Sequence, residues 1–199
     1  SKPENFKLMK WFLWIAILIS VTANGYFVYD ETCVKQNQEQ GELFSRAMGA
    51  SQSKTTWKAG LKLFEDKLKK EHKILADKKY FYINVWTSWC GPCIKEMPWL
   101  DSIAGTLKKD VGYVFVSDLT DKAAENCIKN KKYDLKNFVF INDMNDFISS
   151  ICNEQKLKSR SYPMVLILDN KGKLLHYSTG AYENLKEAAE FEEMINKLE

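Results

Sequence analysis

Metal ligands are scarce in this chain of 199 residues. It has only two histidines, His72 and His176, which stand far apart. Of its five cysteines, only Cys90 and Cys93 have the two-residue spacing typical of a metal-binding or redox pair. A structural zinc site needs four ligands, so this pair lacks its partners and no metal site is expected. Five cysteines are also too few for a fold held together mainly by disulfides.

Charge of one sign is scarce as well. The 29 Lys and Arg residues are offset by 26 Asp and Glu residues, and the formal net charge is +3. Basic and acidic residues are interleaved, which is typical of a solvated exterior. The sequence therefore predicts no nucleic-acid partner, and no cofactor is expected. A hydrophobic content of 45% is that of a globular protein, and the length suits one ordinary domain with additional segments.

One long apolar run is present, over residues 11–29. About twenty apolar residues can cross a bilayer as a helix, and Trp and Tyr suit its two interfaces. Lysines precede the run and acidic residues follow it, which predicts a cytoplasmic N-terminus and a domain outside the membrane. These flanking residues are Lys2, Lys7, Lys10, Asp30 and Glu31. A signal peptide cleaved after the small residues at 21–23 is the alternative, but the apolar run continues past them, which favours an uncleaved anchor.

Three further cysteines have no diagnostic spacing. Cys33 follows the apolar run, and no lipobox-like pattern precedes it, so lipidation is not expected. Cys127 and Cys152 fall on two predicted helices. We expect both to be buried structural thiols, and a disulfide between them is the alternative.

The most informative stretch runs from Tyr80 to Pro98. Tyr80 to Trp86 is aromatic and β-branched, which predicts a buried strand. Trp89, Cys90, Gly91, Pro92 and Cys93 then turn the chain, with Gly91 expected to supply the tight bend and Pro92 tolerated in a first helical turn. Apolar residues recur at helical spacing beyond the turn, and Pro98 is expected to kink that helix.

This geometry predicts redox chemistry at the two cysteines. A thiol at a helix N-terminus lies among unpaired backbone N–H groups and the positive end of the helix dipole, so its thiolate is favoured. Cys90 is at the mouth of the turn and is expected to be the nucleophile. Cys93 lies one turn inward and is expected to be the resolving thiol, which displaces the partner from a mixed disulfide.

The strand, the Trp-Cys-Gly-Pro-Cys turn and a helix with Pro98 five residues after the second cysteine resemble the thioredoxin superfamily. The longer string, with Glu96 between Cys93 and Pro98, resembles the membrane-tethered TlpA/ResA-type oxidoreductases of the bacterial cell envelope. Thioredoxins carry a buried acid six residues before the first cysteine, where this chain has Asn84, as TlpA/ResA-type proteins commonly do. The resemblance implies that Glu96 assists proton transfer. A solvated carboxylate on a helix is the alternative.

A second stretch of the active site follows from the same resemblance. Tyr162 and Pro163 match the superfamily loop whose proline is cis and faces the cysteine turn. The resemblance implies that the backbone of Tyr162 pairs with an extended substrate segment close to Cys90. The family usually has Thr or a similar residue before this proline, so Tyr162 is a departure that leaves the substrate preference open. An ordinary proline at the start of a strand is the alternative.

The resemblance implies an α/β fold, a thioredoxin-like mixed sheet flanked by helices, with an added helix–strand unit at about residues 119–143. Together with the apolar run, the predicted organisation is a membrane anchor at 1–32, a linker at 33–54 and the thioredoxin-like domain at 55–199. A helix capped by Thr55 or Thr56 is expected to open the domain, whereas many TlpA/ResA relatives begin with a β-hairpin.

The function predicted from these residues is a thiol–disulfide oxidoreductase that reduces protein disulfides. The resemblance implies a single-pass protein of the bacterial inner membrane, with its redox domain in the periplasm or outside. It also implies disulfide-bearing envelope proteins, such as apocytochrome c, as partners and a membrane thiol reductant as the electron source. The alternative is a thioredoxin-like subunit of a membrane complex with a mainly binding role.

Overall fold

The computed structural model describes residues 54–75, 77–107, 110–131, 133–157, 159–182 and 185–198. The predicted anchor and its flanking charges, Cys33 and all of the predicted linker except Lys54 lie outside these ranges. Within them, no helix has both the length and the apolar character that crossing a membrane requires. The anchor therefore stays a prediction.

Five strands form one mixed sheet in the order β3-β2-β1-β4-β5. The central strand β1 pairs in parallel with β2 and antiparallel with β4, and the outer pairs are parallel β2–β3 and antiparallel β4–β5. The strands are β1 (Tyr80–Trp86), β2 (Val111–Ser117), β3 (Val139–Ile141), β4 (Met164–Asp169) and β5 (Leu174–Thr179). The predicted mixed sheet is confirmed, and β1 has the bounds that its aromatic and β-branched run predicted.

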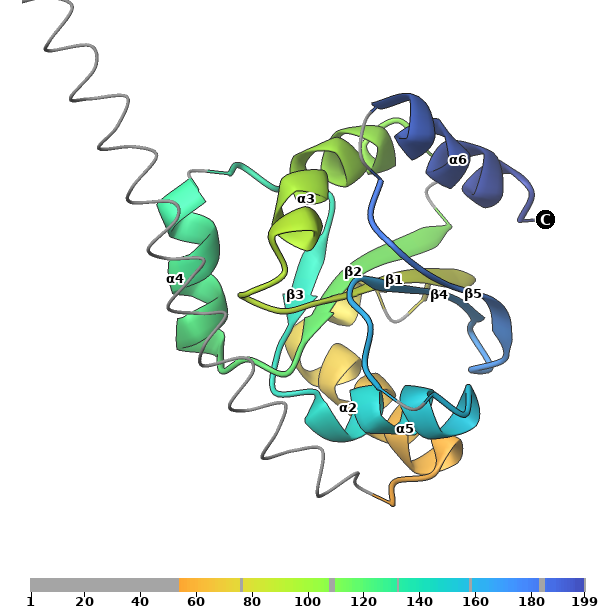
Figure 1. Ribbon diagram of the computed structural model, residues 1–199. Coiled ribbons are helices and arrows are strands. Elements are labelled where there is room, and N and C mark those ends of the chain that lie inside the picture. The colour runs from red at the N-terminus through yellow and green to blue at the C-terminus, as the bar shows by residue number, and fades with distance from the viewer. Residues whose placement is uncertain are drawn as a thin grey trace, which may run out of the picture. The chain divides into compact units, whose positions relative to one another are not determined.

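Helices cover both faces of this sheet (Figure 1). α3 and α6 lie on one face, and α2 and α5 pack together on the other. The helices are α2 (Trp57–Glu71), the short 3-10 helix η1 (Lys73–Leu75), α3 (Gly91–Ala104), α4 (Asp121–Lys131), α5 (Asn145–Glu154) and α6 (Leu185–Asn196). Thr56 caps α2, since its side chain accepts a hydrogen bond from the Ala59 amide, as predicted. The added helix–strand unit is also present, as α4 and β3.

The side chains of β1 point alternately to the two faces of the sheet, and they pack in two separate core clusters. Phe81, Ile83 and Val85 pack with the cluster that α2 and α5 contribute to, while Tyr82 and Trp86 pack with the cluster that contains residues of α3 and α6. Successive side chains of a strand point to opposite faces of the sheet, so Asn84 points to the same side as Tyr82 and Trp86. This register brings a buried amide under the helix that begins at the cysteines.

A buried carboxylate ties the middle of α3 to the loop before β3. Asp101 accepts hydrogen bonds from the backbone amides of Lys136, Asn137 and Phe138, at 3.1, 2.8 and 3.0 Å. The Asn137 side chain also donates to the Asp101 carbonyl at 2.8 Å. Because these amides belong to a loop, they have no partners in a strand, and Asp101 satisfies them. The contact fixes α3 against the added helix–strand unit.

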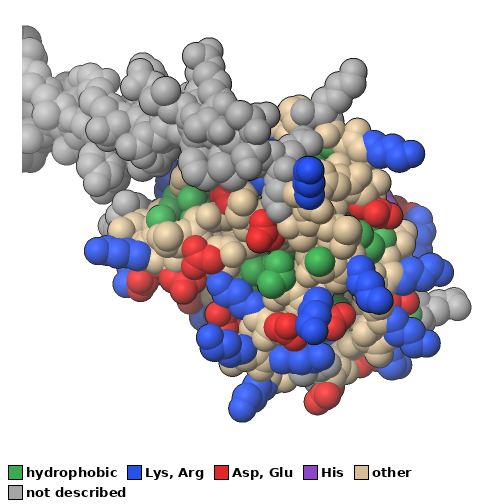
Figure 2. All heavy atoms as spheres, turned by 90° about the horizontal axis from the view of Figure 1, so that it is seen from below, with side chains coloured by type: hydrophobic (Ala, Val, Ile, Leu, Met, Phe, Trp, Pro, Cys, Tyr) green, Lys and Arg blue, Asp and Glu red, His purple; other side chains and the backbone are tan. Residues whose placement is uncertain are grey.

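Cys127 lies on α4 and Cys152 on α5, as predicted. Both are thiols, so the alternative of a disulfide between them does not hold. Cys152 is buried and Cys127 is half-buried. Basic and acidic side chains are intermixed on the face seen from below in Figure 2, with small hydrophobic patches between them.

Candidate active site

The two cysteines of the turn form a disulfide at the start of α3. Cys90 is the residue that caps the helix, and its Sγ accepts a hydrogen bond from the Cys93 amide at 3.2 Å. Cys90 is 5% exposed and Cys93 is fully buried. Cys90 is therefore the cysteine nearer to solvent. Its sulfur accepts a hydrogen bond from an N–H group that would also stabilise a thiolate.

The turn follows from its residue types, with one difference from the prediction. Pro92 lies in the first turn of α3, where its missing N–H breaks no helical hydrogen bond. Gly91 was expected to supply the tight bend, but it is helical, and a Cβ atom there would meet nothing within 4 Å. The bend therefore does not require glycine. A side chain at position 91 would therefore meet no neighbouring atoms at its Cβ.

The loop before β4 lies against this turn. The Tyr162–Pro163 peptide bond is cis, as the resemblance implied. The ring of Tyr162 packs edge-to-face on the ring of Trp89, with centroids 5.4 Å apart. In the part of the chain that the structure describes, the Tyr162 backbone makes no hydrogen bond to another backbone group. Its peptide groups are thus available to an incoming strand beside Cys90.

Glu96 is buried in the second turn of α3, so the alternative of a solvated carboxylate is wrong. The Asn84 side chain donates to one carboxylate oxygen at 2.9 Å, and the Tyr182 amide donates to the other at 2.9 Å. Burial raises the pKa of Glu96 from 4.5 to about 7, and the two hydrogen bonds oppose that rise. Glu96 stands three residues after Cys93 and lies on the same side of the helix. It can therefore hold or release a proton near neutral pH, one turn from the inner cysteine.

Two tyrosines, Tyr82 and Tyr182, interact electrostatically with the buried Glu96. Burial and the nearby Glu96 carboxylate raise the pKa of Tyr182 to about 12. Burial is also the main cause that raises the pKa of Tyr82 well above its ordinary value, with Tyr182 and Glu96 adding to it. Both phenols therefore remain protonated and neutral at neutral pH.

A second polar cluster was not found from the sequence. Arg160 lies 3.4 Å from the carboxylate of Asp118 and donates to the side chains of Asn145 and Ser149 at 2.8 and 2.7 Å. The side chains of Thr87 and Tyr162 also interact with the Asp118 carboxylate, and both interactions lower the pKa of Asp118. These residues come from four separate segments, and no spacing in the sequence relates them.

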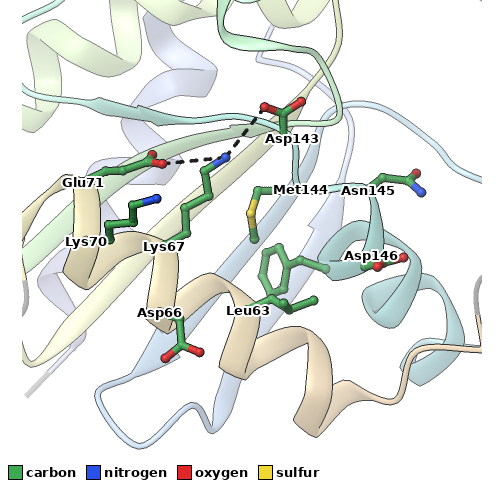
Figure 3. Close-up of a pocket in the computed structure, with 10 residues that line it drawn as sticks. Leu63, Asp66, Lys67, Lys70, Glu71, Asp143, Met144, Asn145 and Asp146 are labelled. Atoms are coloured by element: carbon green, nitrogen blue, oxygen red, sulfur yellow. Dashed lines mark ion pairs between the residues drawn. The ribbon is translucent and has the colours of Figure 1, made fainter.

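A pocket lies elsewhere, between α2 and the start of α5 (Figure 3). It encloses about 520 Å³. Lys67 lies at one side of it and forms ion pairs with Glu71 and Asp143, as the dashed lines in Figure 3 show. Acidic, basic and apolar side chains all line it, so its chemistry selects no particular ligand. This pocket is on the α2 and α5 side of the sheet and does not include the cysteines.

The two histidines are separate from the cysteines. His72 makes a ring hydrogen bond of 3.0 Å with the Phe140 carbonyl, and His176 is half-buried on β5. Within the described ranges, no three acidic, histidine or cysteine residues are grouped so that they could bind a metal ion.

Comparisons with known proteins identify the family of this chain and several relatives. The family model described as redoxin matches residues 62–195. A thiol-disulfide oxidoreductase ResA of Bacillus thuringiensis subsp. konkukian is 31% identical over 122 residues, which cover 60% of this chain and 64% of the relative. Another ResA, of Bacillus cereus, is 32% identical over 114 residues, which cover 56% of this chain and 60% of the relative. The chain thus spans less than two thirds of the length of these relatives.

Solved structures resemble the chain over a similar part. The crystal structure of StoA from Bacillus subtilis is 23% identical, and the match covers 58% of this chain and 84% of StoA with a TM-score of 0.44.

Proposed function

We propose that this chain is a thiol–disulfide oxidoreductase, because it belongs to the redoxin family and to the TlpA/ResA type of the thioredoxin superfamily. Its reacting groups are Cys90 and Cys93. The observation that carries this proposal is the disulfide at the start of α3, with the Cys90 sulfur on the Cys93 amide. A reactive cysteine pair needs such an N–H-rich position, because the thiolate is the attacking form.

The reaction moves two electrons from the protein to its substrate. In the reduced protein, the Cys90 thiolate attacks one sulfur of a substrate disulfide, and the other substrate sulfur leaves as a thiolate. Cys93, once deprotonated, attacks the Cys90 sulfur and expels the second substrate thiolate. The substrate then holds two thiols, and the protein holds the Cys90–Cys93 disulfide that the structure contains.

Glu96 supplies the proton acceptor for the second step. The Cys93 thiol must lose its proton while it is fully buried, where no solvent can accept that proton directly. A carboxyl group with a pKa of about 7, one helical turn away, exchanges protons readily at neutral pH. The Asn84 amide and the Tyr182 N–H keep it pointing into this site.

The surface that receives the substrate consists of five residues: Trp89, Gly91, Pro92, Tyr162 and Pro163. Trp89 and Tyr162 hold the two halves of this surface together, the open space at Gly91 admits the substrate sulfurs, and the Tyr162 backbone pairs with an extended segment. Such a surface suits a disulfide in an unfolded or extended protein segment.

We place this activity in the bacterial cell envelope. The apolar run at 11–29 would anchor the chain in the inner membrane, with the redox domain outside. Disulfide-bearing envelope proteins, with apocytochrome c among them, are then the substrates, and a membrane thiol reductant restores the dithiol. The relatives named above are thiol-disulfide oxidoreductases by name, which supports the class of reaction.

A reduction assay tests the proposal. The full chain, reduced and freed of reductant, should reduce one protein disulfide per molecule. The double variant that carries both Cys90→Ser and Cys93→Ser should reduce none. Native purification addresses the alternative of a binding subunit. A stoichiometric membrane complex that persists without both thiols, together with no reduction by the wild-type chain, would favour the binding role over the enzyme.

A further inference from the structure

Beneath the Tyr162–Pro163 loop lies a charged pair that the reaction above does not use. The side chains of Arg160 and Asp118 are 24% and 11% exposed, and their charged atoms are 3.4 Å apart. Asp118 follows β2, whereas Arg160 precedes β4. The pair therefore joins the ends of two strands that lie on either side of β1.

Both members have further polar partners. Arg160 Nη2 donates to Asn145 Oδ1 and to Ser149 Oγ on α5, and the side chain of Thr87, which follows β1, interacts with the Asp118 carboxylate. Burial raises the pKa of Asp118, and the Arg160 charge opposes that rise. The guanidinium and the carboxylate are thus held in fixed positions by neighbours on both sides.

Tyr162 connects this pair to the cysteine turn. Its ring contacts Trp89, which directly precedes Cys90, and its hydroxyl interacts with the side chains of Asp118 and Arg160. One side chain therefore spans from the reactive turn to the charged pair, and it belongs to the residue whose backbone would pair with substrate.

A buried ion pair is weak evidence for a role in stability, because apolar replacements of similar volume are often as stable. Here the pair lies under a loop, and its contacts fix one side chain of that loop. The ring of Tyr162 packs on Trp89, and its hydroxyl end interacts with the charged pair, so both ends of this side chain have partners.

We propose that Asp118 and Arg160 are positioning residues which hold Tyr162 against Trp89 and so set the affinity for extended polypeptide disulfides. This proposal rests on the proposed function. The structure describes no contact between the pair and Cys90 or Cys93, so the pair acts on the reaction only through Tyr162. A small aromatic disulfide, which has no backbone to pair with Tyr162, does not depend on it.

Two substrates separate this role from a purely structural one. One is an unstructured peptide with an internal disulfide, and the other is 5,5'-dithiobis(2-nitrobenzoic acid). With the full chain, Asp118→Ala should raise KM for the peptide about five- to tenfold, the size expected from losing one hydrogen bond. The kcat for the peptide and the reaction with the small disulfide should stay unchanged. Asp118→Asn keeps an oxygen acceptor for the Tyr162 hydroxyl and should recover part of the peptide KM.

Matched variants control for folding and local damage. Asp121→Ala removes a neighbouring carboxylate, which accepts from Asn142 and not from Tyr162, and should leave the peptide KM unchanged. Arg160→Lys keeps the positive charge but cannot reach all three partners with one amine, and it should raise the peptide KM as Asp118→Ala does. If Asp118→Ala fails to fold, Asp118→Asn and Arg160→Lys carry the same comparison.

The outcomes are distinct. An unchanged peptide KM in Asp118→Ala and Arg160→Lys, with an active wild-type chain, would overturn the positioning role and leave the oxidoreductase standing. Equal losses with both substrates would also overturn it, because they would indicate general damage to the site. A wild-type chain that reduces neither substrate would overturn the proposed function itself, and the positioning role with it.

Discussion

The side-chain amide of Asn84 lies 2.9 Å from the carboxylate of Glu96, although one is on the central strand and the other on the helix that begins at Cys90. The Asn84 oxygen has no hydrogen-bond partner among the described residues. A half-turn of the amide would bring this oxygen to Glu96, where it can accept the proton of a neutral carboxyl group. The pair can therefore accommodate both protonation states of Glu96.

The first prediction concerns the pH dependence of stability. Glu96 has a pKa of about 7 in the folded protein and about 4.5 when exposed. Below pH 4.5 the carboxyl is protonated in both states, and its contribution to stability is fully present. As the pH rises, the unfolded state loses the proton first, so the free energy of unfolding falls until the pH passes about 7. The whole change corresponds to roughly 3 kcal/mol, as an upper figure.

Glu96→Gln removes this titration. Urea unfolding of the oxidised chain at about pH 4 and about pH 8 should show the wild type losing stability relative to the variant as the pH rises. Exposed Glu125→Gln, which loses only its ion pair with Lys129, should follow the wild type. The same Glu96→Gln variant should alter the pH dependence of cysteine reactivity. Parallel stability profiles for wild type and Glu96→Gln would contradict the buried, titrating carboxyl.

The second prediction assigns the two cysteines. Cys93→Ser should accumulate a mixed disulfide through Cys90, because the resolving thiol is gone. Cys90→Ser should accumulate none, since Cys93 is fully buried. Mass spectrometry after incubation with an oxidised substrate protein measures the two yields. Comparable trapping by both variants would show that either thiol can attack.

The sequence predicted the elements whose signals are local. The run Tyr80–Trp86 is apolar and short, and it is a strand with those bounds. Thr56 is a capping residue next to an amphipathic segment, and the helix begins there. Pro98 lies inside α3 as the spacing indicated. Local sequence determines these features because capping, periodicity and proline geometry act within a few residues.

What the sequence did not predict depends on tertiary contacts. Glu96 has the same sequence context whether it is solvated or buried, and only the register of β1 under α3 determines its burial. Asp118 and Arg160 are separated by a helix, a strand and a second helix, so their contact has no signature in spacing. The prediction that Gly91 supplies a tight bend was wrong. Glycine is common in turns, but the backbone at Gly91 is helical and does not require glycine.

The third prediction concerns the carboxylate that anchors the loop before β3. Asp101→Ala leaves three backbone amides without their acceptor and removes one of the two hydrogen bonds of the Asn137 side-chain amide, so it should lower the free energy of unfolding by roughly 3 kcal/mol. Asp134→Ala is the matched control, because this residue is 77% exposed and pairs only with Lys136 at the surface, so its removal should cost under about 0.5 kcal/mol. Chemical denaturation of both variants measures the difference. Similar midpoints for the two would contradict the role of Asp101.

The fourth prediction concerns membrane topology. The lysines before residue 11 and the acids after residue 29 predict an N-terminus in the cytoplasm and a redox domain outside. Protease added to intact spheroplasts should digest the redox domain and leave a membrane-embedded fragment. Protection of the domain in sealed cells, or a mature chain that begins near Asn24, would contradict the uncleaved anchor.

We expect Cys90 and Cys93 to form a reducing pair. Gly91 and Pro92 place no cation between the cysteines, and an ionised Glu96 opposes formation of a thiolate. The helix N-terminus acts the other way, but its effect of ~1 kcal/mol equals only about 20 mV in a two-electron couple. Strong reductants and strong oxidants of this superfamily differ by roughly 150 mV, so the helix terminus cannot reverse the direction.

The most direct test is the reduction potential of the Cys90–Cys93 couple, measured by equilibrating the full chain with dithiothreitol or glutathione buffers. We predict a value close to that of thioredoxin, about −270 mV. A value near about −120 mV, as in a strong disulfide donor, would contradict the reductase and leave only the redox class of the reaction.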